Sequence, residues 1–225
     1  MRELRDGVVE AARVLGGGGV PAALGFACAE IADARGVLWG QRGSEEVCDA
    51  LAAWREPGAE QHLGAVHESL MTGRKEAGAF YTPAFLVEQL LEETLVPLLS
   101  PGQRVRVLDP ACGTGAFLLP AARRIAQTVG VPLADAIACV HGVDLDPVAV
   151  EIARFLLWLE GPSVPRTVLD ANLVVGDGLA LAPDASYDVV VGNPPVLNQL
   201  RTATVRESSV EGVGPYTDTS ALFLL

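Results

Sequence analysis

A Gly-Asn-Pro-Pro sequence at residues 192–195 carries the side chains best suited to chemistry in this chain. It follows the apolar run 187–191, which is typical of a short buried strand. Adjacent prolines lack backbone N–H groups and push each preceding residue into an extended conformation, so the turn is rigid. The Asn193 side-chain amide and the Pro194 carbonyl oxygen can therefore act as fixed acceptors for an amino group. An ordinary strand-ending turn is the alternative.

A second candidate is the sequence Asp-Pro-Ala-Cys-Gly-Thr-Gly at residues 109–115. It lies between a strand pattern over 105–108 and a helical pattern, and this order forms the nucleotide-binding corner of a doubly wound α/β fold. Gly113 and Gly115 permit close backbone approach, and the helix N-terminus favours an anionic group such as a carboxylate. Leu118 replaces the third glycine of the dinucleotide fingerprint, which disfavours a dehydrogenase.

Acidic residues follow the next two predicted strands, at 140–144 and 173–175. Asp144 is placed to accept hydrogen bonds from ribose hydroxyls. Asp146 directly precedes Pro147 and is interpreted as the N-cap of the next helix. Asp177 could accept a hydrogen bond from an adenine amino group, or it could be a turn aspartate.

The elements before these motifs carry no identifiable chemistry. Residues 1–71 are predicted to be mainly helical, with a break over 16–21 and a helix start after Ser44. His62 and His67 are interpreted as structural or exposed. A further amphipathic helix is predicted over residues 84–95, and Thr82 before it could cap it.

Composition narrows the class of protein. The 225 residues are half hydrophobic, which permits a sizeable core, and no apolar run is long enough for a membrane span. The four cysteines have no metal-ligand spacing, so we expect reduced thiols, a cytoplasmic location and no metal. The net charge of −12 argues against strong binding of DNA by this chain alone, with the pairs Arg123 and Arg124, and Arg201 and Arg206, as the local candidates for phosphate contacts.

Five motifs in order resemble the S-adenosylmethionine-dependent N6-adenine DNA methyltransferases of restriction–modification and phage-defence systems. The motifs lie at residues 78–83, 108–117, 142–147, 176–178 and 192–195. The resemblance runs from about His67 to the end and implies a doubly wound, Rossmann-like methyltransferase core. It divides the chain into an N-terminal helical extension (1–71) and an incomplete catalytic domain (72–225).

The resemblance also implies a cofactor and a reaction. The chain would use S-adenosylmethionine to methylate the exocyclic N6 of adenine in DNA. The implied cofactor-binding residues are Tyr81, Thr82, Asp109, Pro110, Ala111, Gly113, Gly115, Asp144 and Asp177. The implied catalytic residues are Asn193, Pro194, Pro195 and Val196.

Two departures from the family pattern leave alternatives open. Val196 stands where the family has an aromatic residue that stacks on the flipped adenine, and the chain ends before the expected recognition region. DNA contact is therefore expected through a region or subunit outside this chain, with a specificity or nuclease subunit as a further partner. A non-catalytic cofactor-binding or assembly subunit, and a protein-glutamine or RNA methyltransferase, are the alternative functions.

Overall fold

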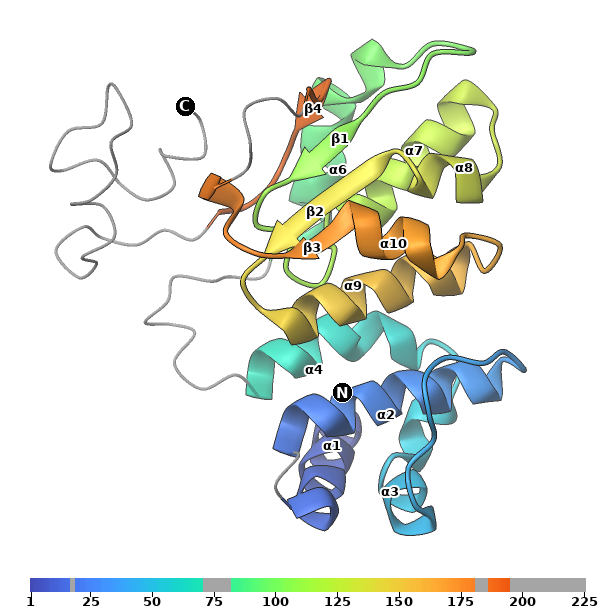
Figure 1. Cartoon of the computed structure of the whole chain (residues 1–225), viewed down its shortest axis with the longest axis vertical. Coiled ribbons are helices and arrows are strands. Elements are labelled where there is room, and N and C mark those ends of the chain that lie inside the picture. Colours follow the sequence, from blue (N-terminus) through green and yellow to red (C-terminus); the bar gives the residue numbers. More distant parts are fainter. Residues whose placement is uncertain (17–18, 71–81, 181–185, 195–225) are drawn as a thin grey trace, which may run out of the picture.

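The computed structural model describes residues 1–16, 19–70, 82–180 and 186–194. Within these ranges, a layer of helices from the N-terminal part lies against a layer that contains a parallel sheet (Figure 1). The predicted boundary near residue 71 lies outside the described residues, as do Tyr81, Pro195, Val196 and the arginines at 201 and 206. No single helix in the described ranges is both long and apolar enough to cross a membrane.

The sheet contains four parallel strands in the order β3-β2-β1-β4. The strands are β1 (Val107–Asp109), β2 (Val140–Asp144), β3 (Leu173–Val175) and β4 (Val189–Val190). The chain passes outward from β1 to β2 and β3 and then returns to the other side of β1. Ligands of such sheets bind beyond the carboxyl ends of the strands at the reversal, which here lies between β1 and β4. The predicted doubly wound α/β fold is confirmed.

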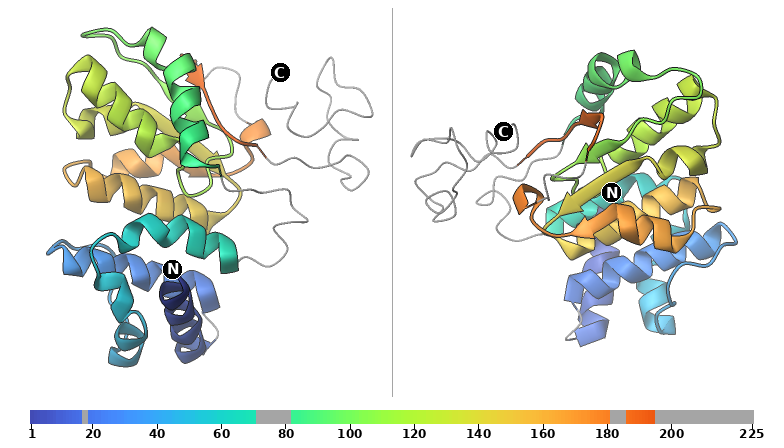
Figure 2. Two further views of the ribbon diagram at one scale, coloured as in Figure 1. Left: turned by 180° about the vertical axis from the view of Figure 1, so that it is seen from behind. Right: turned by 45° about the horizontal axis from the view of Figure 1, so that its top comes forward.

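A row of helices, α6, α7 and α9, covers one face of the sheet (Figure 2). The elements of this layer are α6 (Ala84–Thr94), η4 (Val96–Leu98), α7 (Leu118–Val129), α8 (Leu133–Ile137), α9 (Pro147–Glu160), α10 (Arg166–Asn172) and η5 (Gly178–Ala180). Their apolar side chains form one core with the strands, in which Phe117 and Leu118 at the start of α7 are almost fully buried. Each such side chain contributes roughly 1.5–3 kcal/mol of burial free energy.

The N-terminal helices form a second apolar core. They are α1 (Arg2–Leu15), α2 (Gly19–Ala34), α3 (Glu45–Ala50), η2 (Ala52–Arg55), η3 (Ala59–His62) and α4 (Leu63–Leu70). Trp54 is fully buried there, and its indole N–H donates to the carbonyl oxygen of Leu4 at 3.1 Å. The predicted break between α1 and α2 is shorter than expected, because α2 begins at Gly19 and holds Pro21 in its first turn, where no backbone N–H is needed.

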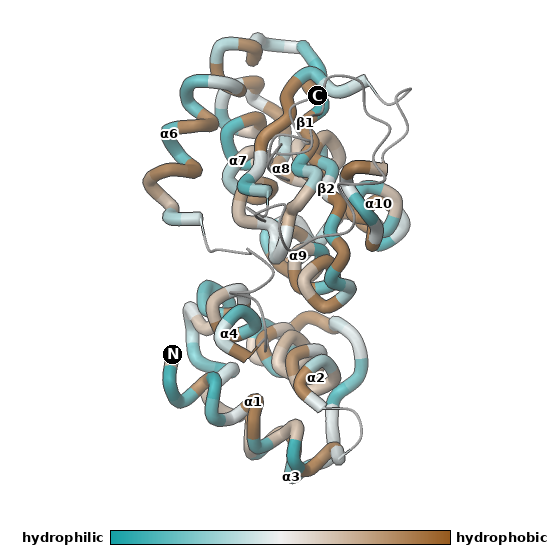
Figure 3. Tube along the Cα trace, turned by 90° about the vertical axis from the view of Figure 1, so that its left-hand side faces the viewer, coloured by the Kyte–Doolittle hydropathy of each residue, from teal (hydrophilic) through white to brown (hydrophobic). Residues whose placement is uncertain are grey.

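Helix α9 joins the two cores. Figure 3 shows it between the N-terminal helices and the sheet layer. Its buried side chains recur at helical spacing on two faces. Val150, Ala153 and Leu157 belong to the sheet core, whereas Ile152, Phe155 and Leu159 belong to the helical core. The N-terminal helical layer is thus attached to the sheet layer through α9, the helix that follows β2 and Asp146.

Candidate functional site

The carboxyl ends of the four strands bring the predicted motifs to one edge of the sheet. In the strand register Asp109 of β1 pairs with Gly142, and Asp144 of β2 pairs with Val175. The loop after β4 lies on the other side of β1, where the Val191 N–H donates to the carbonyl oxygen of Leu108 at 2.9 Å. Four of the five motifs named from the sequence therefore converge in space.

The loop between β1 and α7 has the backbone conformation that its glycines predict. Gly113 and Gly115 have φ of +52° and +88°, which favour residues without a Cβ. The Ala111 N–H donates to Asp109 Oδ1 at 3.1 Å, and the Cys112 N–H donates to the Val143 carbonyl at 2.9 Å. The loop is therefore held at its start and against β2 before α7 begins.

Asp144 connects this loop to the next one. Its Oδ2 accepts a hydrogen bond from the Gly113 N–H at 2.7 Å, and its Oδ1 accepts one from the Asp146 N–H at 2.9 Å. The side chain is partly exposed, and each carboxylate oxygen has a further lone pair for a ligand hydroxyl. The sequence did not indicate this organising role, and the contact with ribose stays a prediction.

Asp146 is the N-cap of α9, as predicted. Its Oδ1 accepts hydrogen bonds from the N–H groups of Val148 at 2.9 Å and Ala149 at 3.4 Å. These bonds satisfy donors that a helix start leaves without intrahelical partners. Pro147 occupies the first helical position, where its fixed φ suits the helix.

The loop after β3 lies tightly on the glycine loop. A Cβ built at Gly178 would overlap the carbonyl oxygen of Pro110, so a side chain at that position would separate the two loops. Asp177 is exposed, and its Oδ1 accepts a hydrogen bond from the Leu179 N–H at 3.0 Å. This bond confirms a turn aspartate, while contact with an adenine amino group stays a prediction.

Two exposed leucines on these loops were not singled out from the sequence. Leu145 is 72% exposed between the two acidic residues that follow β2, and Leu179 is 38% exposed after β3. Apolar side chains beside hydrogen-bonding carboxylates suit a ligand that combines an aromatic base with ribose hydroxyls. The signal available in the sequence was a Leu among the acidic and glycine residues that follow β2 and β3.

Asp109 is buried, and its electrostatic environment is unusual. Burial raises the pKa of this carboxyl to about 7, the Ala111 N–H opposes the rise, and the nearby Asp144 charge adds to it. The remaining predicted residues are Thr82, Asn193 and Pro194. Thr82 is buried but does not cap α6, because Pro83 is the N-cap and no side-chain hydrogen bond caps this helix. Asn193 is exposed, and Pro194 is partly buried.

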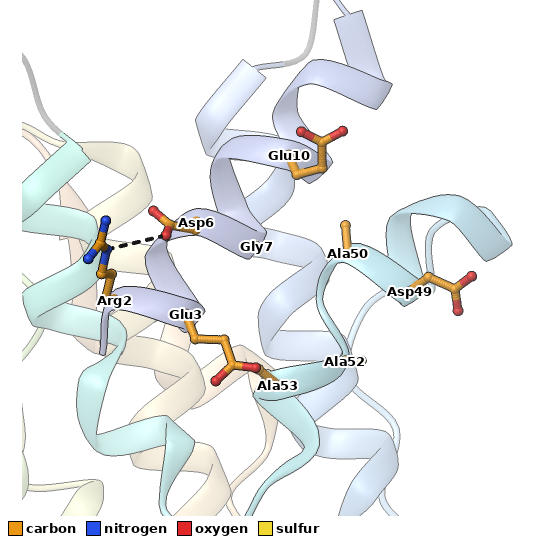
Figure 4. Close-up of a pocket in the computed structure, with 9 residues that line it drawn as sticks. All are labelled: Arg2, Glu3, Asp6, Gly7, Glu10, Asp49, Ala50, Ala52 and Ala53. Atoms are coloured by element: carbon orange, nitrogen blue, oxygen red, sulfur yellow. Dashed lines mark ion pairs between the residues drawn. The ribbon is translucent and has the colours of Figure 1, made fainter.

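Within the described ranges, the two arginines predicted to contact phosphate offer little attraction for DNA. Arg123 forms an ion pair with Glu160 at 2.8 Å, and Arg124 pairs with Glu88 and Glu92, so these predicted phosphate contacts are already engaged with acids. A surface hollow of about 580 Å³ lies between α1 and α3 in the N-terminal helical layer (Figure 4). Its charged lining comprises Arg2, Glu3, Asp6, Glu10 and Asp49. Excess carboxylates would repel phosphate there.

No cluster of three or more His, Cys, Asp or Glu side chains in the described ranges is arranged to hold a metal ion. All four cysteines are free thiols, and burial raises the pKa of the Cys112 thiol well above its ordinary value. A thiol that resists ionisation is a poor nucleophile. Cys112 is therefore a small packing residue of the glycine loop, as predicted.

Comparisons with known proteins agree with this geometry. The profile of the family described as N-6 DNA Methylase matches residues 59–224. The adenine-specific methyltransferase PglX of Streptomyces coelicolor is 33% identical over 169 residues, which cover 63% of this chain and 14% of the relative. The type II methyltransferase M.VspI of a Vibrio species is 29% identical over 187 residues, or 80% of this chain and 41% of the relative.

A solved structure is similar in fold over almost the whole chain. The type IIG restriction endonuclease BpuSI superposes with a TM-score of 0.67 at 17% sequence identity, covering 99% of this chain and 31% of that one. The chain thus spans less than half the length of each of these three proteins.

Proposed function

Because the chain belongs to the N-6 DNA Methylase family, we propose that it transfers a methyl group from S-adenosylmethionine to the exocyclic N6 of adenine in DNA. The observation that carries this proposal is the contact between the loops after β1 and β4. It sets the Asn193-Pro194 acceptors beside the glycine loop at the reversal of strand order.

The residues at the strand ends fit S-adenosylmethionine, the cofactor expected for this family. The loop at Gly113 and Gly115 allows close backbone approach, and Asp144 keeps lone pairs for hydroxyl donors. Leu145 and Leu179 add exposed apolar surface on the adjoining loops. When bound, the cofactor supplies a methyl group activated by a positively charged sulfur.

The chain's own chemical task is to position the amino group. The nitrogen lone pair of adenine N6 is delocalised into the ring, so it is a poor nucleophile. Asn193 Oδ1 and the Pro194 carbonyl oxygen would accept its two hydrogens, favour a pyramidal nitrogen and direct the lone pair towards the methyl donor. This requires an adenine that has left the base stack, which costs a few kcal/mol in duplex DNA.

DNA must be held mainly by protein beyond the described surface. The net charge is −12, Arg123 and Arg124 are paired with acids, and Val196 offers no flat face for stacking. Stacking on an aromatic side chain typically contributes ~1–3 kcal/mol per base. A separate recognition region or subunit is the partner that would provide both phosphate contacts and specificity.

A substrate comparison tests the proposal. The chain is incubated with tritiated S-adenosylmethionine and DNA, RNA or glutamine-containing protein, each with and without a candidate recognition polypeptide. Label in N6-methyladenine of DNA supports the proposal. Label in RNA or in protein glutamine would show that the substrate is that molecule and not DNA. Cofactor binding without transfer to any of the three would indicate an assembly subunit.

A further inference from the structure

One face of α4 lies against both loops that the cofactor would use. Gly64 and His67 are three residues apart on this helix and therefore share a face. A Cβ at Gly64 would lie 2.6 Å from Thr114 Oγ1 in the glycine loop, which shows how closely the helix approaches. His67 is only 1% exposed and extends to the loop after β2.

The imidazole of His67 contacts the helix cap of α9. Its Nε2 lies 3.0 Å from Asp146 Oδ2, while Asp146 Oδ1 caps the helix. The two atoms are within hydrogen-bond distance, although the contact is not aligned as an ideal hydrogen bond. Both atoms are buried, so little water competes for the contact.

Asp146 passes this restraint on to the glycine loop. Its backbone N–H donates to Asp144 Oδ1 at 2.9 Å, and Asp144 Oδ2 accepts from the Gly113 N–H at 2.7 Å. A continuous series of polar contacts thus connects a buried residue of the N-terminal helices with the backbone of Gly113. Loss of the His67 ring nitrogens would leave Asp146 Oδ2 buried without this contact.

We propose that His67 is a positioning residue for the cofactor site: by fixing Asp146, it holds Asp144 and the glycine loop in their binding conformation. The proposal rests on the proposed function, because it takes the cofactor to bind at these loops. It assigns the N-terminal helices a part in the site, although His67 would not touch the ligand.

The test compares substitutions of His67 with one that disturbs only the packing of α4. His67→Phe keeps a buried ring but removes both nitrogens, and His67→Gln restores an N–H donor. Val66→Ala is the control, because Val66 is fully buried in the helical core beside His67. Each variant is measured by calorimetric titration with S-adenosylmethionine and by amide hydrogen exchange of the cofactor-free chain.

We expect His67→Phe to weaken cofactor affinity by about three- to tenfold, the effect of one indirect polar contact, and to speed exchange at Gly113 and Asp146. His67→Gln should recover much of both, and Val66→Ala should lower the melting temperature without these changes. Wild-type affinity and exchange in His67→Phe, or equal losses in Val66→Ala, would overturn the inference. A wild-type chain without affinity for S-adenosylmethionine would instead contradict the proposed function, and the exchange comparison would still decide whether His67 restrains the loop.

Discussion

Gly192, at the end of the apolar run of β4, lies directly against the buried carboxylate of Asp109 at the end of β1. A Cβ built at Gly192 would sit 2.6 Å from Asp109 Oδ1, closer than real side chains approach. The two strands are neighbours in the sheet, so this contact sets the spacing between the glycine loop and the Asn193-Pro194 turn. The lack of a side chain at Gly192 therefore brings the two halves of the site together.

Substitution of this glycine should damage the site. Gly192→Ala forces either the β4 loop or Asp109 to move, and overpacking of this kind costs about 1–3 kcal/mol. Gly25→Ala is the matched control, because a Cβ there meets nothing within 4 Å in the middle of α2. It should be neutral or stabilising by up to about 1 kcal/mol. Urea unfolding gives both free energies, and equal stability of the two variants would contradict the close contact.

Asp109 should make stability depend on pH. The native carboxyl, with its pKa raised to about 7, keeps a proton that the unfolded chain releases near pH 4. Between these two pH values the native state binds more protons than the unfolded chain, so the free energy of unfolding falls as pH rises from about 4 to about 7. Above about pH 7 the contribution of Asp109 no longer changes with pH. A rise of about three pKa units corresponds to a loss of up to about 4 kcal/mol. Urea unfolding at several pH values should show a shallower decline for Asp109→Asn, whereas parallel curves would refute the assignment.

The two acids after β2 should have separable effects. Asp144→Ala removes a carboxylate that accepts from Gly113 and is predicted to accept from ribose, so affinity for S-adenosylmethionine should fall roughly ten- to a hundredfold. Asp146→Ala should instead cost about 1 kcal/mol of stability through loss of the helix cap, with a smaller effect on affinity. Calorimetry and thermal unfolding of both variants provide the comparison. An unchanged dissociation constant for Asp144→Ala would remove it from the binding site.

The parts of the site that could be predicted from the sequence are local. Asp146-Pro147 identifies the start of α9, and Gly113 and Gly115 identify the turn after β1, because caps and positive-φ positions depend on adjacent residues. The short strands were recognisable from their apolar runs. Pro21 led to an overlong break, because the first turn of a helix tolerates proline.

The relationships that could not be predicted join distant parts of the chain. The contact of Gly192 with Asp109 and that of His67 with Asp146 depend on the order of strands and on the packing of α4. A lone His in an apolar stretch is compatible with many buried positions. Only the packing of α4 against the start of α9 identifies Asp146 as the partner of His67.

Asn193 is proposed to act on the substrate amino group and not on the cofactor. Asn193→Ala should therefore bind S-adenosylmethionine within about twofold of wild type, while methyl transfer falls about 10²–10³-fold through loss of a positioned polar group. Both quantities are measured with the same recognition polypeptide present, by calorimetry and by mass spectrometry of N6-methyladenine in digested DNA. Intact cofactor affinity with transfer reduced to this extent is the predicted result. Unchanged transfer, or a loss of cofactor affinity as large as the loss of transfer, would contradict this role of Asn193.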